Sequence, residues 1–221
     1  MADPATSAKW PDRILDPMDR ISEVLFGLIM ALTFTCTLGV ATANDIQVRT
    51  MLIGALGCNL AWGIIDGGVY LLARLNERGR AIVSWRAVRN AADVGAAHRI
   101  VASTLPPLVA SILEPAQLEC MRQGLHQLPE PARPRLTKND WLGALGICLL
   151  SFLSTFPIVI PFLLIGDARL ALRASNAVAI AMLFVCGFMF ARYAGFRPMV
   201  MGLSFVALGI AMVGVAIALG G

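Results

Sequence analysis

The stretch Cys58–Arg80, "CNLAWGIIDGGVYLLARLNERGR", passes from apolar residues into a cluster of arginines, and one aspartate, Asp66, lies inside the apolar part. A run of about 20 predominantly apolar residues crosses the hydrocarbon core of a bilayer as a helix. Arginines that follow such a run are typical of the cytoplasmic boundary of a membrane. The stretch therefore predicts the end of a membrane-spanning helix that carries a carboxyl group.

The composition of the whole chain agrees with a membrane protein. Of its 221 residues, 57% are hydrophobic and 14% are charged, whereas soluble domains average about 45–50% and about 25%. The first twenty residues are polar and lack an early apolar core, so we expect no cleavable signal sequence. We expect the net charge of +4 to face the anionic lipids of the cytoplasmic leaflet, and we expect no nucleic-acid partner.

Five apolar runs predict an all-α integral membrane protein with five transmembrane helices. Helices are expected because each one satisfies its own backbone hydrogen bonds in lipid. The expected spans are 21–43, 51–75, 141–165, 170–193 and 199–219. The polar link 44–50 predicts that the first two spans form an antiparallel hairpin. The expected segments are a cytoplasmic N-terminus, this hairpin, a cytoplasmic helical segment and three further spans: 1–20, 21–75, 76–140 and 141–221.

The basic residues predict the orientation of the chain. With the N-terminus in the cytoplasm, 15 of the 18 lysines and arginines fall on the cytoplasmic side. Only Arg49, Arg169 and Arg173 then fall outside, and the opposite orientation inverts that ratio. Five spans then place the C-terminus outside, and we expect a bacterial inner membrane.

The segment 76–140 predicts short cytoplasmic helices. Residues 81–103 mix apolar and basic positions at helical spacing, which predicts an amphipathic helix that ends before Pro106 and Pro107. A second short helix is expected over 108–125, and Asn139 or Asp140 is expected to cap the third span. The acidic, sulfur and imidazole side chains of this segment match no strong zinc or calcium spacing. We interpret them as solvated, with a weak metal alternative at Glu114, Glu119 and His126.

Asp66 is the strongest candidate for a functional residue. A charge near the bilayer centre costs about 2.5–3.5 kcal/mol on insertion scales, so such residues usually face an interior or a water path. One interpretation is a cation or proton site, and the other is an aspartate that ties two helices together by a hydrogen bond. Helical spacing predicts one shared polar and aromatic face for Asn59, Trp62, Gly63, Asp66 and Tyr70.

Glu23 is the second intramembrane carboxyl candidate. Met30 and threonines continue its helix face, and a carboxylate, a thioether and hydroxyls suit a divalent cation of intermediate softness. The alternative is a solvated interfacial acid beside ordinary packing residues. Because the hairpin is antiparallel, Glu23 and Asp66 both fall in its cytoplasmic half, where they can approach each other or their mates in a dimer. The candidate pore ligands are therefore Glu23, Met30, Asn59 and Asp66.

Two further features complete the pattern. Pro157 and Pro161 predict a bend in the third span, which shapes a cavity or only accommodates packing. The chain has no P-loop, GxSxG, HExxH or nucleotide fingerprint, so we expect neither an enzyme nor a bound cofactor.

The sequence resembles the vacuolar iron transporter family over nearly its whole length. The likeness is carried by "SEVLFGLIMALTFT" (22–35), "IIDGGVYLLA" (64–73), "FPIVIPFLL" (156–164) and the glycine-rich fifth span. Ser22–Glu23 resembles the family's Ser-Asp-Gly motif, whose acid lines the pore. The resemblance implies five spans, a helical cytoplasmic segment, a dimeric pore and transport of Fe²⁺ or Mn²⁺.

The chain also departs from that family. Span two lacks a glutamate and a methionine at matching positions, and Asp66 is a displaced substitute for that glutamate. Residues 76–140 hold nine basic and six acidic residues instead of a glutamate array. Two hypotheses follow. One is a divalent metal exporter driven by proton antiport, and the other is a non-transporting membrane scaffold whose basic segment binds lipid or a protein.

Overall fold

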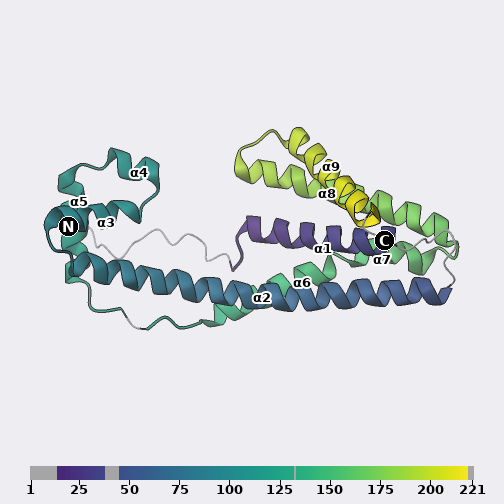
Figure 1. Cartoon of the computed structure of the whole chain (residues 1–221), viewed down its shortest axis with the longest axis horizontal. Helices are drawn as coiled ribbons and strands as arrows, with labels where there is room; N and C mark the ends of the chain where they lie inside the picture. Colours follow the sequence, from purple (N-terminus) through teal and green to yellow (C-terminus); the bar gives the residue numbers. More distant parts are fainter. Residues whose placement is uncertain (1–13, 38–44, 132, 219–221) are drawn as a thin grey trace, which may run out of the picture. The chain divides into compact units, whose positions relative to one another are not determined.

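The described part of the chain is helical throughout its regular structure (Figure 1). The structure, a computed structural model, describes residues 14–37, 45–131 and 133–218. These residues divide into two compact units, Met1–Tyr70 with Lys138–Gly221, and Leu71–Thr137. The helices are α1 (Pro17–Thr37), α2 (Asp45–Arg89), α3 (Val94–Ser103), α4 (Pro107–Ile112), α5 (Pro115–Gln127), α6 (Lys138–Leu153), α7 (Phe156–Leu164), α8 (Ala168–Ala194) and α9 (Pro198–Ala218).

Four helical stretches among the described residues are long and apolar enough to cross a membrane. They are Gln47–Arg89, Lys138–Leu164, Ala168–Ala194 and Pro198–Val215. They correspond to the second to fifth expected spans. The first expected span, 21–43, is covered by α1 only as far as Thr37, and its remaining residues lie outside the described part.

Helix α1 lies at the centre of the first unit, between the α8–α9 hairpin and α6 (Figure 1). Its side chains Leu28, Ala31 and Leu32 form a buried apolar cluster with one residue of α7 and three of α8. A second cluster joins Met51 and Leu52 of α2 to Val159 of α7. Helix α1 is thus packed against helices that belong to the candidate spans.

Helices α8 and α9 form the closest helix pair of this unit, lying side by side in Figure 1. Their contact depends on glycines: a Cβ at Gly187 would lie 2.5 Å from the carbonyl oxygen of Met201. The turn between them begins at Gly195, whose φ of 76° is left-handed and caps α8. Glycine adopts this conformation without the steric cost that a Cβ adds.

Helix α2 differs from expectation at both ends. Residues 45–50 were expected as a polar link, but α2 already begins at Asp45. Residues 81–103 were expected as a separate amphipathic helix, but α2 continues without interruption to Arg89, and α3 begins only at Val94. The physical reason is the absence of a proline between these points, together with an ion pair at 3.1 Å between Arg74 and Glu77, one turn apart.

The third expected span is interrupted at its middle, where α6 ends at Leu153 and α7 begins at Phe156. Pro157 lies in the first turn of α7, a position that proline tolerates because no helical N–H is needed there. In a continuous helix the ring of Pro157 would clash with the carbonyl group of Leu153, four residues earlier, and Leu153 is where α6 ends. The expected cap at Asn139 or Asp140 is wrong, because α6 already begins at Lys138 and Asp140 is buried in its first turn.

The second unit contains the end of α2 and the short helices α3, α4 and α5, which gather in one group in Figure 1. Its core consists of Val88, Ala97 and Val101, with leucines of α5 against them. Trp85 donates a hydrogen bond of 3.0 Å to the carbonyl oxygen of Leu125. The expected single helix over 108–125 is wrong, because Pro115 begins a new helix and separates α4 from α5.

Candidate functional site

Glu23 on α1 and Asp66 on α2 lie near enough for their carboxyl groups to interact electrostatically. Glu23 is 8% exposed, and Asp66 is half-buried. We call these two residues the carboxyl pair. The pair therefore brings two carboxyl groups to a single place.

Asn59 lies deeper in the bundle, about two turns before Asp66 on α2. Its Nδ2 donates a hydrogen bond of 3.1 Å to the carbonyl oxygen of Gly27 on α1, and a short one to Oγ1 of Thr155. Residue 23 of α1 pairs with residue 66 of α2, and residue 27 of α1 pairs with residue 59 of α2. The residue number thus rises along α1 as it falls along α2. Helices α1 and α2 therefore run antiparallel where they meet.

The interruption between α6 and α7 brings three hydroxyl side chains into the same region: Ser151, Ser154 and Thr155 are all buried. Gly27 makes this approach possible, because a Cβ there would lie 2.7 Å from the carbonyl oxygen of Ser151. Ser154 donates its hydroxyl to that same carbonyl oxygen at 2.8 Å. Together with the carboxyl pair and Asn59, these hydroxyls form what we call the polar cluster.

The polar cluster lies near the middle of three apolar helices. Gly27 is central in α1, and Thr155 is close to the midpoint of the candidate span Lys138–Leu164. Interrupted helices with polar side chains at mid-depth are typical of binding sites in membrane transporters. Four buried side-chain oxygens of the cluster have no hydrogen-bond partner: Glu23 Oε2, Asn59 Oδ1, Asp66 Oδ2 and Ser151 Oγ.

Met30, expected as a pore ligand, lies in a different environment from the carboxyl pair. It lines an apolar groove of about 260 Å³ together with Phe26, Thr33 and Trp62. Trp62 is 39% exposed, whereas Asn59 on the same predicted face of α2 is fully buried. The structure brings Glu23, Asn59 and Asp66 into the polar cluster and leaves Met30 in this groove.

Sequence reasoning missed the hydroxyl side chains of the interruption. The motif Ser154-Thr155-Phe156-Pro157 carried a usable signal, because a proline inside an apolar run marks a helix break about one turn before it, where these hydroxyl residues lie. Among the described residues, no three or more His, Cys, Asp or Glu side chains gather in a way that would hold a metal ion. Any cation at the polar cluster would therefore depend on the carboxyl pair plus neutral oxygens.

In the second unit, Glu119 forms ion pairs and hydrogen bonds with neighbouring side chains instead of meeting another carboxyl group. Glu119 binds Arg122 through contacts of 2.7 and 2.8 Å, His98 at 3.0 Å and Gln123 at 2.8 Å. Arg122, followed by Gln123 and His98, lowers the pKa of the Glu119 carboxyl group well below its usual value. Glu114 is the N-cap residue directly before α5, where its backbone N–H donates to the side chain of Gln117, and His126 lies in the last turn of that helix. The structure does not bring Glu114, Glu119 and His126 together as a metal-binding group.

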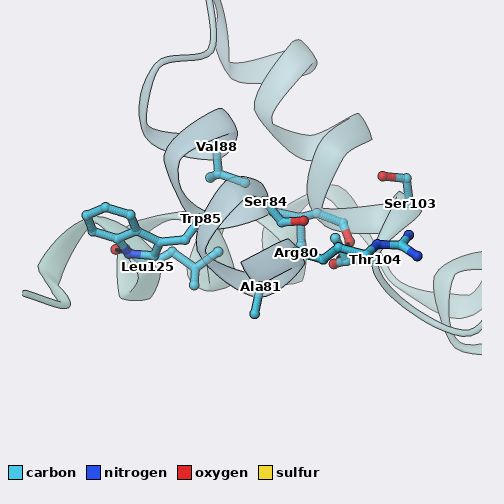
Figure 2. Close-up of a pocket in the computed structure, with 9 residues that line it drawn as sticks. Arg80, Ala81, Ser84, Trp85, Val88, Ser103, Thr104 and Leu125 are labelled. Carbon is cyan, nitrogen blue, oxygen red and sulfur yellow. Dashed lines mark hydrogen bonds between the residues drawn. The ribbon is translucent and has the colours of Figure 1, made fainter. Parts of the chain in front are cut away.

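A cavity of about 510 Å³ lies beside α2 in the second unit. Figure 2 shows Trp85 and Leu125 on one side of it and Arg80, Ser103 and Thr104 on the other. The cavity thus combines an apolar wall with a guanidinium group and hydroxyls. Such a lining suits a ligand with an anionic group and an apolar part.

Comparison with known proteins adds no assignment: no protein-family model matches the chain, and no curated protein matches it.

Proposed function

We propose that this chain is a membrane transporter that exports a divalent metal ion, Fe²⁺ or Mn²⁺, from the cytoplasm in exchange for protons. The observation that carries the proposal is the interaction of Glu23 on α1 with Asp66 on α2, one of the candidate spans. Ionisable residues at such depth usually mark ion pathways or proton relays. The resemblance to the vacuolar iron transporter family points in the same direction.

The carboxyl pair supplies a physical basis for coupling. Two adjacent carboxylates repel each other, so in the absence of a cation the pair retains a proton. A divalent cation that binds both groups favours their fully ionised form and releases that proton. Opposite movements of cation and proton then follow from one site that holds either of them.

The topology belongs to the same proposal. Helix α1 would be the first of five spans and would add one to the four candidate spans, since it is enclosed by α6, α8 and α9. With five spans and the N-terminus in the cytoplasm, the second unit would face the cytoplasm and the C-terminus the outside of a bacterial inner membrane. We also propose a homodimer, which the family resemblance implies.

Reconstituted liposomes test this function. We expect purified wild-type protein to carry Fe²⁺ or Mn²⁺ across the membrane with a counterflow of protons, measured with metal-sensitive and pH-sensitive dyes. Glu23→Gln and Asp66→Asn should each abolish both fluxes. Glu77→Gln is the matched control, because Glu77 is an exposed acid on the same helix as Asp66. Wild-type flux in both carboxyl variants would overturn the proposal.

A second candidate function rests on the cavity of the second unit. A non-transporting scaffold would use Arg80 and the neighbouring hydroxyls to hold an anionic lipid headgroup beside the apolar wall of Trp85. Added phosphatidylglycerol should then raise the thermal midpoint of the wild-type protein in neutral detergent. Arg80→Gln should lose this response, and Arg99→Gln should keep it because Arg99 does not line the cavity. Equal responses in wild type and Arg80→Gln would contradict a lipid site there.

A further inference from the structure

The cavity of the second unit has walls that the chain itself holds in place. Val88 of α2 and Val101 of α3 are buried in one apolar cluster, with leucines of α5 against it. Trp85 is fixed by its hydrogen bond of 3.0 Å to the carbonyl oxygen of Leu125. A cavity bounded by helices that already pack together needs no ligand to form it, as is usual for the sites of small molecules.

The size of the cavity suits an organic ligand. Its volume of about 510 Å³ lies within the range of about 300–1,000 Å³ that is typical of small-molecule sites. One water molecule occupies only about 30 Å³ in the liquid. The cavity therefore has room for a molecule with a carbon skeleton as well as a charged group.

Arg80 is the charged side chain of this cavity. Of the nine described residues that line it, no other carries a full charge, so no carboxylate competes there for the guanidinium group. Two neighbouring arginines of α2 are engaged within the chain: Arg78 donates to the carbonyl oxygen of Arg135, and Arg86 pairs with Glu130 at 2.8 Å. Arg80 has no such partner among the described residues, which leaves its N–H donors available for an anion.

Ser84 adds a donor beside that guanidinium group. It lies four residues after Arg80 on α2, so the two side chains are neighbours on one helix face. Its hydroxyl group also has no hydrogen-bond partner in the described part of the chain. A guanidinium fork donates two parallel bonds to an oxyanion, and the hydroxyl adds a third from the next turn. The oxygens of a phosphate group surround a tetrahedral centre and meet such donors, whereas the two oxygens of a carboxylate lie in one plane.

Ser103 and Thr104 bring acceptor oxygens to the same side of the cavity as Arg80 (Figure 2). Ser103 donates its hydroxyl group to the carbonyl oxygen of Ile100 at 2.8 Å, and Thr104 donates to that of Val101 at 2.7 Å. Because each hydroxyl proton is committed in this way, both oxygens accept hydrogen bonds from a ligand. They also end α3, where the helix dipole is negative and favours a donor over a second anion.

We infer that the cavity binds a phosphate ester of a polyol. The phosphate group is held by Arg80 and Ser84. A hydroxyl group of the polyol donates to Ser103 or Thr104, and the carbon skeleton lies against Trp85. A free polyol phosphate and the glycerol phosphate headgroup of an anionic lipid share this chemistry. The inference deepens the second candidate function, on which it rests, by naming the ligand class, and it does not depend on metal transport.

Calorimetric titration of four matched probes into the full-length chain, delipidated and held in neutral detergent, tests this inference. Glycerol 3-phosphate and methyl phosphate are soluble esters with and without free hydroxyl groups, and phosphatidylglycerol and phosphatidylmethanol are the corresponding lipids. We expect the wild type to bind the hydroxyl-bearing member of a pair about two- to tenfold more tightly, the effect of one neutral hydrogen bond. Binding of the soluble pair would identify a free ligand, and binding of the lipid pair alone would identify a headgroup.

Variants assign the two ends of the ligand. Arg80→Gln should weaken both members of the bound pair by about tenfold or more, because it removes a charge-assisted bond. The double variant Ser103→Ala with Thr104→Val should weaken only the hydroxyl-bearing member and so abolish the preference. Arg99→Gln and Ser111→Ala are the matched controls, since neither residue lines the cavity and the Ser111 hydroxyl group also donates within its own helix, at 2.9 Å.

Thermal midpoints without ligand separate binding from a structural role. If Arg80 only complements the negative end of α3, Arg80→Gln should lower the midpoint and leave every affinity unchanged, which would overturn the inference. Tighter binding of glycerate, a carboxylate with the same hydroxyl groups, than of glycerol 3-phosphate would overturn the phosphate class.

The outcomes also separate this inference from both proposed functions. Equal wild-type affinity for the two members of each pair, with weaker binding in Arg80→Gln, would refute the polyol and leave the anion site of the second candidate function in place. Binding of none of the four probes would refute the cavity as a phosphate site. Each of these results leaves the transport proposal standing, because its failure is measured as a loss of metal and proton flux.

Discussion

Gly63→Ala tests the contact between α2 and α6 that positions the polar cluster. A Cβ at residue 63 would lie 2.9 Å from the carbonyl oxygen and 3.0 Å from the Cα of Cys148. Both are backbone atoms, which cannot rotate away, so the two helices must separate. Overpacking of this kind costs about 1–3 kcal/mol of the free energy of unfolding. The same movement would draw Asn59 away from Gly27 and Thr155.

Gly68→Ala is the matched control, since it makes the same change on the same helix with nothing within 4 Å of the new Cβ. Alanine in place of an unobstructed helical glycine gains about 0.5–1 kcal/mol. Because the same gain applies at Gly63, it cancels in the comparison, and the two variants should differ by about 1–3 kcal/mol, or roughly 2–12 °C in thermal midpoint at about 2–4 °C per kcal/mol for a chain of this length. Midpoints measured in detergent decide the matter. If Gly63→Ala melts together with Gly68→Ala, the close approach of α2 and α6 is refuted.

Three further predictions concern the turn of the first unit and the core of the second. Gly195→Ala should cost about 1–2 kcal/mol because a Cβ opposes the left-handed backbone there, and an unchanged thermal midpoint would contradict this. Trp85→Phe should cost about 1 kcal/mol by leaving the carbonyl oxygen of Leu125 without its donor, read from the same melts. Glu119→Gln should destabilise the second unit at neutral pH. Because the folded-state pKa of Glu119 is lowered, its contribution is complete above about pH 4.3 and is lost as the pH falls further, so melts of variant and wild type should converge in acid and stay apart at pH 7.

Several local features were predictable because they depend on residues close together in the sequence. The apolar runs around the second to fifth spans correspond to helices long enough to cross a membrane. The antiparallel course of α1 and α2 followed from the short connection between them. The sequence prediction failed where α2 begins, because only helix propensity distinguishes a polar link from a first helical turn there. It failed again after the second expected span, where the Arg74–Glu77 ion pair favours a continuous helix.

In the candidate site, too, some residues were predictable from the sequence and others were not. Glu23 and Asp66 stood out in the sequence because carboxyl groups are costly in lipid and therefore conspicuous. Ser151 did not, because a serine in an apolar helix is ordinary unless its hydroxyl lacks the usual carbonyl partner. That condition is known only from the position of atoms in neighbouring turns.

The amino-acid sequence by itself determined that this protein is helical with several segments long and apolar enough to cross a membrane, and it indicated two acidic candidates, since hydrophobic length and the cost of buried charge are properties of single segments. Only the tertiary structure decided that Glu23 meets Asp66, that Asn59 and Ser151 lie beside one interruption, and that Met30 lies apart. These relations depend on which glycines allow helices to approach, and that approach is set by contacts between residues far apart in the chain.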